Sequence, residues 1–338
     1  MLLIQKQIAA QLKSVSDESD TEARLILAHV LNCQPTELIN YTDEQITSTL
    51  QVKINQIIQS RLTGKPLQYI LQEVWFYRRR FYIDERALIP RPESEWMIEA
   101  GLEFIKAIEN KKVPKQNQTH INSNSPKKES ELQQLNIADV GSGSGNLAIT
   151  LAKELADNSK LQNIKVYAVD VSPEALEVAS ININNNFPTC PQPDKEIFKS
   201  NPTTTFSEPI NINNQLKIEI LQGNLLEPLL SRQISPDIII ANLPYIPTGR
   251  ISRLQTEVKD HEPHVALDGG EDGFELYREF FQQITQLKNL PRLIITEIDY
   301  THIPIAQNII TQYLSLEKFR TSIEVHNYTG FIKIESIN

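Results

Sequence analysis

A glycine-rich turn behind a carboxylate is the first feature of this sequence that could bind a small molecule. The segment Asp139 to Gly145 reads DVGSGSG, directly after a short apolar run and before a helical pattern. Its three glycines let the backbone approach a ligand closely and present N–H groups at a helix N-terminus. The spacing is GxGxG, whereas dinucleotide sites typically show GxGxxG. An acidic neighbour suits a cationic ligand, so the pattern favours S-adenosylmethionine, with candidate contacts at Asp139, Gly141, Ser142, Gly143 and Gly145.

A second carboxylate, Asp170, ends the apolar segment KVYAVDV. At the tip of a strand it could accept hydrogen bonds from both hydroxyls of a ribose. Ser172, immediately before Pro173, is the better N-cap for the following helix, which leaves Asp170 available for a ligand. We assign Val171 to the same candidate cofactor site.

The segment Ala241 to Pro247, ANLPYIP, follows another apolar run and could orient an amide. An amide nitrogen is a poor nucleophile, because its lone pair is delocalised into the carbonyl, so an enzyme must hold it in one orientation. The side-chain oxygen of Asn242 and the backbone carbonyl of Leu243 could accept the two N–H hydrogens. Such fixed dipoles also stabilise the positive charge that develops on nitrogen. Pro244 stiffens the turn and Tyr245 can pack on the planar amide.

Other nitrogen atoms that could accept a methyl group from S-adenosylmethionine pose the same geometric problem. The exocyclic amines of adenine-N6 and cytosine-N4 need the same kind of turn, but bases flipped out of nucleic acid usually require a basic groove. The net charge is −9, which argues against a surface that grips phosphates. A protein that binds S-adenosylmethionine or a partner without catalysis is a third alternative. A basic patch around the pocket would indicate a nucleic-acid substrate. An occluded pocket would indicate a binding protein without catalysis.

These motifs need a scaffold that brings strand ends together. LNIADV, KVYAVDV, IEILQGN, DIIIANL and PRLIITEI are short apolar runs, and helical segments separate the first of them. This alternation predicts a mostly parallel sheet with helices on both faces. Ligands in such sheets bind at the carboxyl ends of the strands, where all three motifs fall.

The first part of the chain has a different pattern. Residues 21–71 are helical, with a helix start expected at Asp43 and Glu44 and a helix end at Gly64. The stretch VWFYRRRFYI, residues 74–83, predicts a β-hairpin, in which the three arginines form a solvated surface. A further helix is expected over 92–109. We therefore divide the chain into a helical domain at 1–72, a hairpin linker at 73–90 and a catalytic domain at 91–338, with polar insertions near 110–134 and 188–216.

Composition limits the class of protein. A length of 338 residues exceeds one usual core, which supports two domains. No apolar run approaches the roughly 20 residues that cross a bilayer, and the start of the chain does not resemble a signal peptide, so we expect a cytoplasmic protein. Cys33 and Cys190 suggest neither a disulfide framework nor a zinc site. His261 and His264 lack a third ligand, so we expect no metal.

The ordered set of motifs resembles the HemK/PrmC family, the release factor glutamine methyltransferases. The resemblance is carried by the glycine turn, Asp170, the Asn242–Tyr245 turn, the upstream ALIPRPESEWMIEAGL, the downstream HEPHVALDGGEDGFELYREF, and the segments EARLILAHVL and RLTGKPLQYI. It covers nearly the whole chain apart from the two polar insertions.

The resemblance implies a class I methyltransferase fold, Rossmann-like, with a mostly parallel seven-stranded sheet and a helical substrate-recognition domain. It implies methylation of the glutamine in the Gly-Gly-Gln motif of class I peptide chain release factors, the proteins of translation termination, with S-adenosylmethionine as donor. Asn224 and Leu225 fall at its adenine site. It assigns the substrate amide to Asn242 and Tyr245 and borders the active site with Arg91 and Glu262. We expect a monomer.

Four departures from the family pattern bear on detail. Leu243 stands where the family usually has proline, which should reduce the rigidity of the turn more than its chemistry, since the contact there is a backbone carbonyl. Asn224 replaces a usual aspartate and is uncharged. The strand IITEIDYTH differs from the family's glycine-containing form, and the ending NYTGFIKIE lacks its usual arginine.

Overall fold

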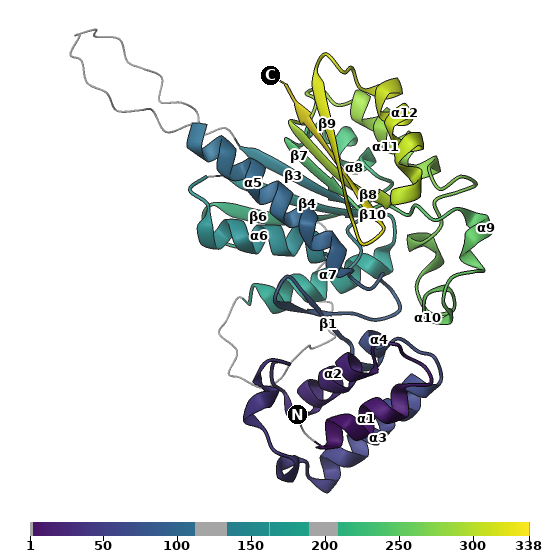
Figure 1. Ribbon diagram of the computed structural model, residues 1–338. Coiled ribbons are helices and arrows are strands. Elements are labelled where there is room, and N and C mark those ends of the chain that lie inside the picture. Colours follow the sequence, from purple (N-terminus) through teal and green to yellow (C-terminus); the bar gives the residue numbers. More distant parts are fainter. Residues whose placement is uncertain (1–2, 112–133, 162, 189–208, 338) are drawn as a thin grey trace.

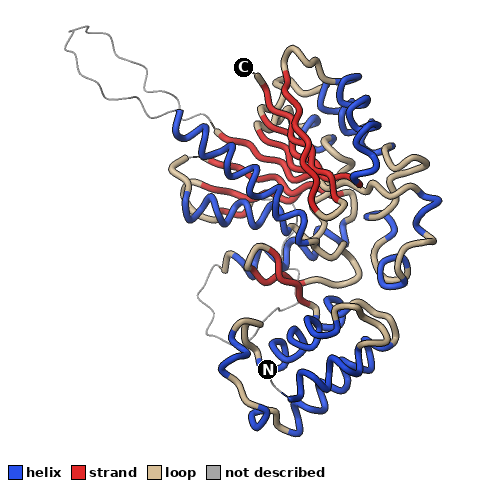
Figure 2. Tube along the Cα trace, in the orientation of Figure 1, coloured by secondary structure: helices blue, strands red, loops and turns tan. Residues whose placement is uncertain are grey.

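The computed structural model describes residues 3–111, 134–161, 163–188 and 209–337. A helical domain at the N-terminal end is joined through a two-stranded hairpin to a larger α/β domain (Figure 1). Figure 2 shows the single large sheet of that domain, with helices on both of its faces. The predicted fold class is therefore confirmed. No helix among the described residues is both long enough and apolar enough to span a membrane.

Apolar residues at helical spacing build the first domain. Its elements are α1 Leu3–Leu12, α2 Ser19–Leu31, η1 Glu37–Asn40, η2 Asp43–Gln45, α3 Ser48–Leu62 and α4 Leu67–Leu71. Ile8 of α1, Ile26 of α2 and Ile58 of α3 are fully buried in one cluster. Cys33 lies at its edge as a free thiol, and Cys190 lies outside the described residues.

At the predicted helix start, Asp43, only the short 3-10 helix η2 begins, and the long helix starts five residues later. The helix α3 begins at Ser48, and the Thr47 hydroxyl accepts a hydrogen bond from the Leu50 N–H at 3.3 Å. The Asp43 carboxylate instead accepts from the backbone N–H groups of Leu3 and Ile4, at 2.9 and 3.1 Å. Those groups open α1 and have no partner within their own helix. Asp43 is therefore a residue type that favours helix caps, but the helix that its side chain caps is α1, which is distant in sequence.

The predicted hairpin is confirmed as β1 Glu73–Phe76 and β2 Arg79–Tyr82. Tyr77 and Arg78 both have positive φ, 48° and 59°, as a two-residue turn that matches strand twist requires. Arg78 is exposed as expected, whereas the other two arginines are partly buried. Arg79 pairs with Glu154 at 2.6 Å, and Arg80 pairs with Glu73 across the hairpin.

The large sheet has the strand order β5-β6-β4-β3-β7-β8-β10-β9. Its strands are β3 Leu135–Val140, β4 Ile164–Asp170, β5 Ile210–Asn211, β6 Leu216–Gln222, β7 Ile238–Ala241, β8 Leu293–Asp299, β9 Phe319–His326 and β10 Thr329–Ser336. The strands β6, β4, β3, β7 and β8 pair in parallel, and each of the other three pairs antiparallel with its neighbours. One strand exceeds the expected seven: the short β5, which lies inside the predicted insertion at 188–216. Residues 112–133 and 189–208 of the two insertions lie outside the described residues.

Helices cover both faces of this sheet (Figure 1). One face carries α5 Glu95–Lys111, α6 Asn146–Asn158 and α7 Pro173–Asn186, and the other carries α8 Glu227–Ser231, α11 Glu275–Thr285 and α12 Ile303–Tyr313. Because side chains alternate along a strand, Ile240 of β7 packs on the first face and Ile239 on the second. Short elements line the loops: η3 Pro92–Ser94, α9 Thr248–Ile251, α10 Thr256–Lys259, η4 His264–Ala266 and η5 Tyr300–His302.

A buried arginine joins the two domains at a second place. Arg61 of α3 is 1% exposed, and its guanidinium donates to Glu22 of α2 at 2.9 Å and to Glu257 of α10. A buried charge is costly unless it is paired and hydrogen-bonded. The two carboxylates satisfy it from both sides of the domain junction, so this pairing fixes α10 against the helical domain.

Gly101, in the middle of α5, allows a test of the packing beneath the sheet. A β-carbon added there would lie 3.6 Å from Ile240 Cδ1, which is ordinary van der Waals contact. Gly101→Ala should therefore raise the free energy of unfolding by about 0.5–1 kcal/mol, because glycine is the poorer helix former. Denaturant unfolding would measure this change, and a lower stability would contradict the packing. Gly145→Ala is the contrast: φ is +78° and the β-carbon would lie 3.1 Å from Ala179 Cβ, so stability should fall.

Candidate active site

A cavity of about 300 Å³ lies at the carboxyl ends of the parallel strands. Gly141 follows β3, Asp170 ends β4, Asn224 follows β6 and Asn242 follows β7, and all four line it. The chain runs from β3 outward to β4 and β6 on one side, and continues from β7 to β8 on the other. Ligands of such sheets bind where the strand order reverses in this way, in cavities of this size or larger. The fold thus brings the separate sequence motifs to one place.

Most of the predicted site residues line this cavity: Gly141, Gly143, Asp170, Val171, Asn224, Leu225, Asn242, Leu243 and Pro244. The others, which the structure places outside its lining, are Asp139, Ser142, Gly145, Tyr245, Arg91 and Glu262. Each of this second group lies beneath or beside a residue that does line the cavity.

Asp139 supports the glycine turn from below. Its Oδ2 atom accepts hydrogen bonds from the Ser142 hydroxyl at 2.8 Å and from the Ala148 N–H at 3.0 Å. The turn is therefore tied to the start of α6, where Gly145 packs against α7. The other oxygen, Oδ1, is buried and has no hydrogen-bond partner among the described residues. Burial raises the pKa of Asp139 to about 7, against the usual 3.8.

Asp170 holds the opposite wall. Its two carboxylate oxygens accept from the Gly143 N–H at 2.8 Å and from the Ser172 N–H at 2.9 Å. Ser172 caps α7 through the Ala175 N–H at 3.1 Å, as predicted. Burial raises the pKa of Asp170, while the backbone N–H groups oppose that shift. A carboxylate has about four acceptor positions, so Asp170 retains capacity for ribose hydroxyls.

The residues fit S-adenosylmethionine on two further observations. A β-carbon added to Gly143 would meet no atom within 4 Å, so the glycine turn leaves open space above its backbone. Asn224 donates its Nδ2 hydrogen to Glu279 Oε1 at 2.6 Å. That bond commits the donor end of the amide to α11 and leaves the acceptor oxygen for a ligand amine.

The Asn242–Tyr245 turn is anchored through side chains. Asn242 Nδ2 donates to the Ser94 hydroxyl at 3.2 Å, and the Tyr245 hydroxyl donates to Glu297 Oε1 at 3.3 Å. Tyr245 thus points into the protein, and burial raises its pKa well above 10, which keeps it a donor. Leu243, the departure from proline, is buried and packs on the glycine turn: its Cδ2 would lie 3.1 Å from a β-carbon at Gly141.

The segment after the turn clamps it in place. The Ile246 N–H donates to the Leu267 carbonyl at 3.2 Å, and the Gly269 N–H donates back to the Ile246 carbonyl at 2.9 Å. A β-carbon at Gly273 would collide with the Tyr245 carbonyl oxygen, so only glycine allows this close approach. The downstream DGGEDG segment therefore supplies rigidity that a second proline would otherwise give.

Arg91 and Glu262 form an ion pair beside the cavity. Glu262 is 5% exposed, and burial raises its pKa, while Arg91 opposes that shift. The next residue, Pro263, lines the cavity. The pair thus positions a wall of the cavity, and its contact with substrate stays a prediction.

The sequence motifs missed two side chains of the site, Ser94 and Glu297. Both are buried, and the Ser94 hydroxyl donates to Glu297 Oε2 at 2.5 Å. Ser94 lies in the segment RPES, for which the sequence predicts only a helix start. Glu297 lies in IITEI, for which it predicts only a strand. The cavity lining that was not assigned is Arg86, Ala87, Leu88, Val169, Ser172, Ala175, Pro263, Val265, Ala266 and Leu276.

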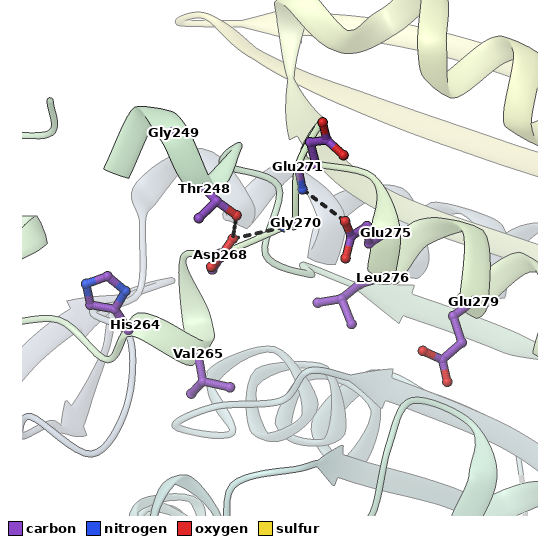
Figure 3. A pocket seen from close by; sticks show the side chains of 11 residues that line it. Thr248, Gly249, His264, Val265, Asp268, Gly270, Glu271, Glu275, Leu276 and Glu279 are labelled. Carbon is purple, nitrogen blue, oxygen red and sulfur yellow. Dashed lines mark hydrogen bonds between the residues drawn. The ribbon is translucent and has the colours of Figure 1, made fainter. Parts of the chain in front are cut away.

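An open acidic hollow of about 940 Å³ adjoins the cavity (Figure 3). Val265 and Leu276 line both spaces, and the carboxylates of the hollow are Asp268, Glu271, Glu275 and Glu279. Asp268 accepts from the Thr248 hydroxyl at 2.6 Å, and Glu275 accepts from the Glu271 N–H at 3.0 Å. Across the described ranges, no three His, Cys, Asp or Glu side chains are grouped to hold a metal ion. The approach to the cavity from this side is therefore negatively charged.

Two family models match the chain: the PrmC N-terminal domain at residues 4–71 and a methyltransferase domain at residues 132–193. Among curated relatives, the release factor glutamine methyltransferase of Bacillus anthracis is 30% identical over 82% of this chain and 79% of its own length. The proteins of the same name from Dictyoglomus turgidum and Bacillus subtilis are 33% and 29% identical. They align over 80% and 83% of this chain and 76% and 79% of their own lengths.

The raised pKa of Asp139 makes stability depend on pH. The folded state binds this proton more tightly than the unfolded state, so its stabilising contribution is complete below about pH 3.8 and is lost as pH rises through about 7. Asp139→Asn cannot titrate. Relative to this variant, the parent should lose about 2 kcal/mol of unfolding free energy between pH 5.5 and 8. Denaturant unfolding of both proteins without ligand measures the difference, and a gap that does not change with pH would refute it.

Proposed function

We infer, since this chain belongs to the release factor glutamine methyltransferase family, that Asn242 and its neighbours orient the acceptor amide of a release factor. The enzyme transfers a methyl group from S-adenosylmethionine to the side-chain amide nitrogen of a glutamine. The observation that carries the assignment of Asn242 is its position: it lines the cavity, and its donor nitrogen is turned away toward Ser94.

Two acceptors would hold the substrate amide. Asn242 Oδ1 and the Leu243 carbonyl accept one N–H hydrogen each, which aims the nitrogen lone pair out of the amide plane. The Tyr277 hydroxyl approaches the Leu243 carbonyl at 3.4 Å, but it also donates to the Glu297 carbonyl. A carbonyl oxygen has two lone pairs, so Leu243 can still accept from substrate. Methyl transfer needs no general base beforehand, because the proton leaves the charged nitrogen afterwards.

Other residues would bind the cofactor, which supplies the methyl group. The backbone of Gly141 and Gly143 would face it, Asp170 would accept from the ribose hydroxyls, and Asn224 would accept from the adenine amine. Val171 and Leu225 would provide apolar contact, since both line the cavity. Asp139, Ser142 and Gly145 would act indirectly, by fixing the glycine turn.

We further propose that the acceptor is the glutamine of the Gly-Gly-Gln motif in class I release factors, recognised with help from the helical domain. The enzyme would act as a cytoplasmic monomer. The acidic hollow beside the cavity disfavours the nucleic-acid alternative, because carboxylates repel a phosphate backbone. A cavity lined by residues of all the motifs supports catalysis over binding alone.

The substrate is tested by incubating the enzyme with labelled S-adenosylmethionine and either a recombinant class I release factor or a duplex oligonucleotide. Mass mapping should place one methyl group on the glutamine of Gly-Gly-Gln. A release factor with that glutamine changed to alanine serves as the control and should stay unlabelled. Label on the oligonucleotide alone would overturn the assignment of the acceptor.

The orienting role of Asn242 predicts a separation of binding from turnover. Asn242→Ala should lower kcat roughly 100- to 1,000-fold, the usual loss when one preorganised dipole is removed. The Kd for S-adenosylmethionine, measured by calorimetry, should stay close to that of the parent. Asn158→Ala, at the exposed end of α6, is the control. A loss of cofactor binding in proportion to the loss of rate would contradict the role.

The Asn224–Glu279 contact predicts that restoring the family's usual aspartate is harmful here. Asn224→Asp places a second carboxylate within 2.6 Å of Glu279 Oε1, where like charges repel. The Kd for S-adenosylmethionine should rise by about tenfold, and adding Glu279→Gln should reverse most of that rise. Calorimetry at pH 7.5 measures all three proteins. Tighter binding by Asn224→Asp alone would show that the pair does not matter.

A further inference from the structure

Glu297 is a buried carboxylate next to the catalytic turn that the proposed chemistry does not use. It lies on β8 and is 2% exposed. Its Oε2 accepts from the Ser94 hydroxyl at 2.5 Å and its Oε1 accepts from the Tyr245 hydroxyl at 3.3 Å. Its backbone carbonyl accepts from Tyr277, which ties the strand to α11. Burying a carboxylate costs more free energy than burying an apolar residue, so the presence of an acid at this position calls for a functional explanation.

The hydrogen bonds determine which end of the Asn242 amide faces Ser94. In its ionised form Glu297 can only accept, so the single hydrogen of the Ser94 hydroxyl is then committed to it. The Ser94 oxygen can then only accept from its other neighbour, which is Asn242 at 3.2 Å. Burial raises the pKa of Glu297, while the side chains of Ser94, Tyr245 and Asn242 oppose that rise by favouring the charged form. The NH₂ end of Asn242 must therefore face Ser94 and Glu297.

An asparagine side chain has two nearly isosteric orientations that differ only in which end is donor and which is acceptor. If Asn242 were flipped, its oxygen would face two acceptors, and its NH₂ group would meet the N–H hydrogens of the incoming amide. Neither contact is a hydrogen bond. Selection between the two orientations thus decides whether the cavity presents an acceptor or a donor to substrate.

We propose that Glu297 is a positioning residue that acts through Ser94 to lock the Asn242 amide with its oxygen toward the acceptor glutamine. This inference rests on the proposed role of Asn242. Glu297 itself does not line the cavity. Tyr245 is the fourth member of the network, so the same carboxylate also sets the orientation of its ring.

The test uses the full-length enzyme with a recombinant class I release factor and compares Glu297→Gln, Ser94→Ala and the matched control Glu73→Gln. Glu73 is also a buried carboxylate, but it lies on the hairpin outside the site. Each site variant should lower kcat roughly 10- to 100-fold, as is usual for partners that orient a functional group. The KM for release factor and the Kd for S-adenosylmethionine should change less than about threefold. The control should keep the parent kcat.

A double-mutant cycle separates positioning from general damage to the fold. If Glu297 acts through Asn242, adding Glu297→Gln to Asn242→Ala should cause no further loss of kcat. Losses that multiply would show that Glu297 acts independently, and would overturn the proposal. Ser94→Ala in the same cycle gives a second answer if Glu297→Gln does not fold.

The outcomes also distinguish this proposal from the proposed function. If Asn242→Ala is fully active, the orienting role of Asn242 is wrong and the role of Glu297 falls with it. If Asn242→Ala is impaired while Ser94→Ala and Glu297→Gln keep the parent kcat, only the positioning role is wrong. Restoration of rate by Ser94→Thr, which keeps the hydroxyl, would support the hydrogen-bonded route over simple packing.

Discussion

The parallel pairing of β3 with β7 is the constraint on which the active site depends. Val140 lies opposite Ala241 in this register, so the chain leaves both strands side by side. The glycine turn and the Asn242 turn therefore begin as neighbours, and Leu243 packs against Gly141. In the proposed function, a methyl donor held by the first turn would therefore lie next to an acceptor amide held by the second. The reversal of strand order at this place leaves room for both.

Three buried or nearly buried carboxylates convert that arrangement into a rigid one. Asp139 lies under the glycine turn, Asp170 stands at its side, and Glu297 lies under the Asn242 turn. A carboxylate removed from water must be hydrogen-bonded, and in each case at least one donor belongs to a loop that lines the cavity or to a side chain behind it. Burial thus raises the pKa of each acid, and the hydrogen bonds that the buried acid requires hold the neighbouring loop in place. In the proposed function, the groups that contact the acceptor amide are neutral dipoles, and the carboxylates lie behind them.

The extent to which sequence predicted this site follows the distance over which each signal acts. The glycine turn and the Asn242 turn are short motifs at strand ends, and their position follows from alternating strands and helices. Ser94 and Glu297 are 203 residues apart, and neither has a local pattern that announces the other. Their meeting depends on how α5 packs against β8, which periodicity does not specify. Asp43 is a similar case: a short 3-10 helix begins there as predicted, but its carboxylate caps α1, a contact that only tertiary packing determines.

The buried Arg61 gives the molecule a mechanical property beyond its stability. It binds Glu22 in the helices and Glu257 in α10, and the chain after α10 soon reaches Pro263 in the wall of the cavity. A displacement of the helices would therefore be transmitted toward that wall by the Arg61 guanidinium, in addition to the Tyr69 hydroxyl that donates to the carbonyl of Ala87. The helical domain and this wall of the cavity are therefore coupled through a charge that both of them share.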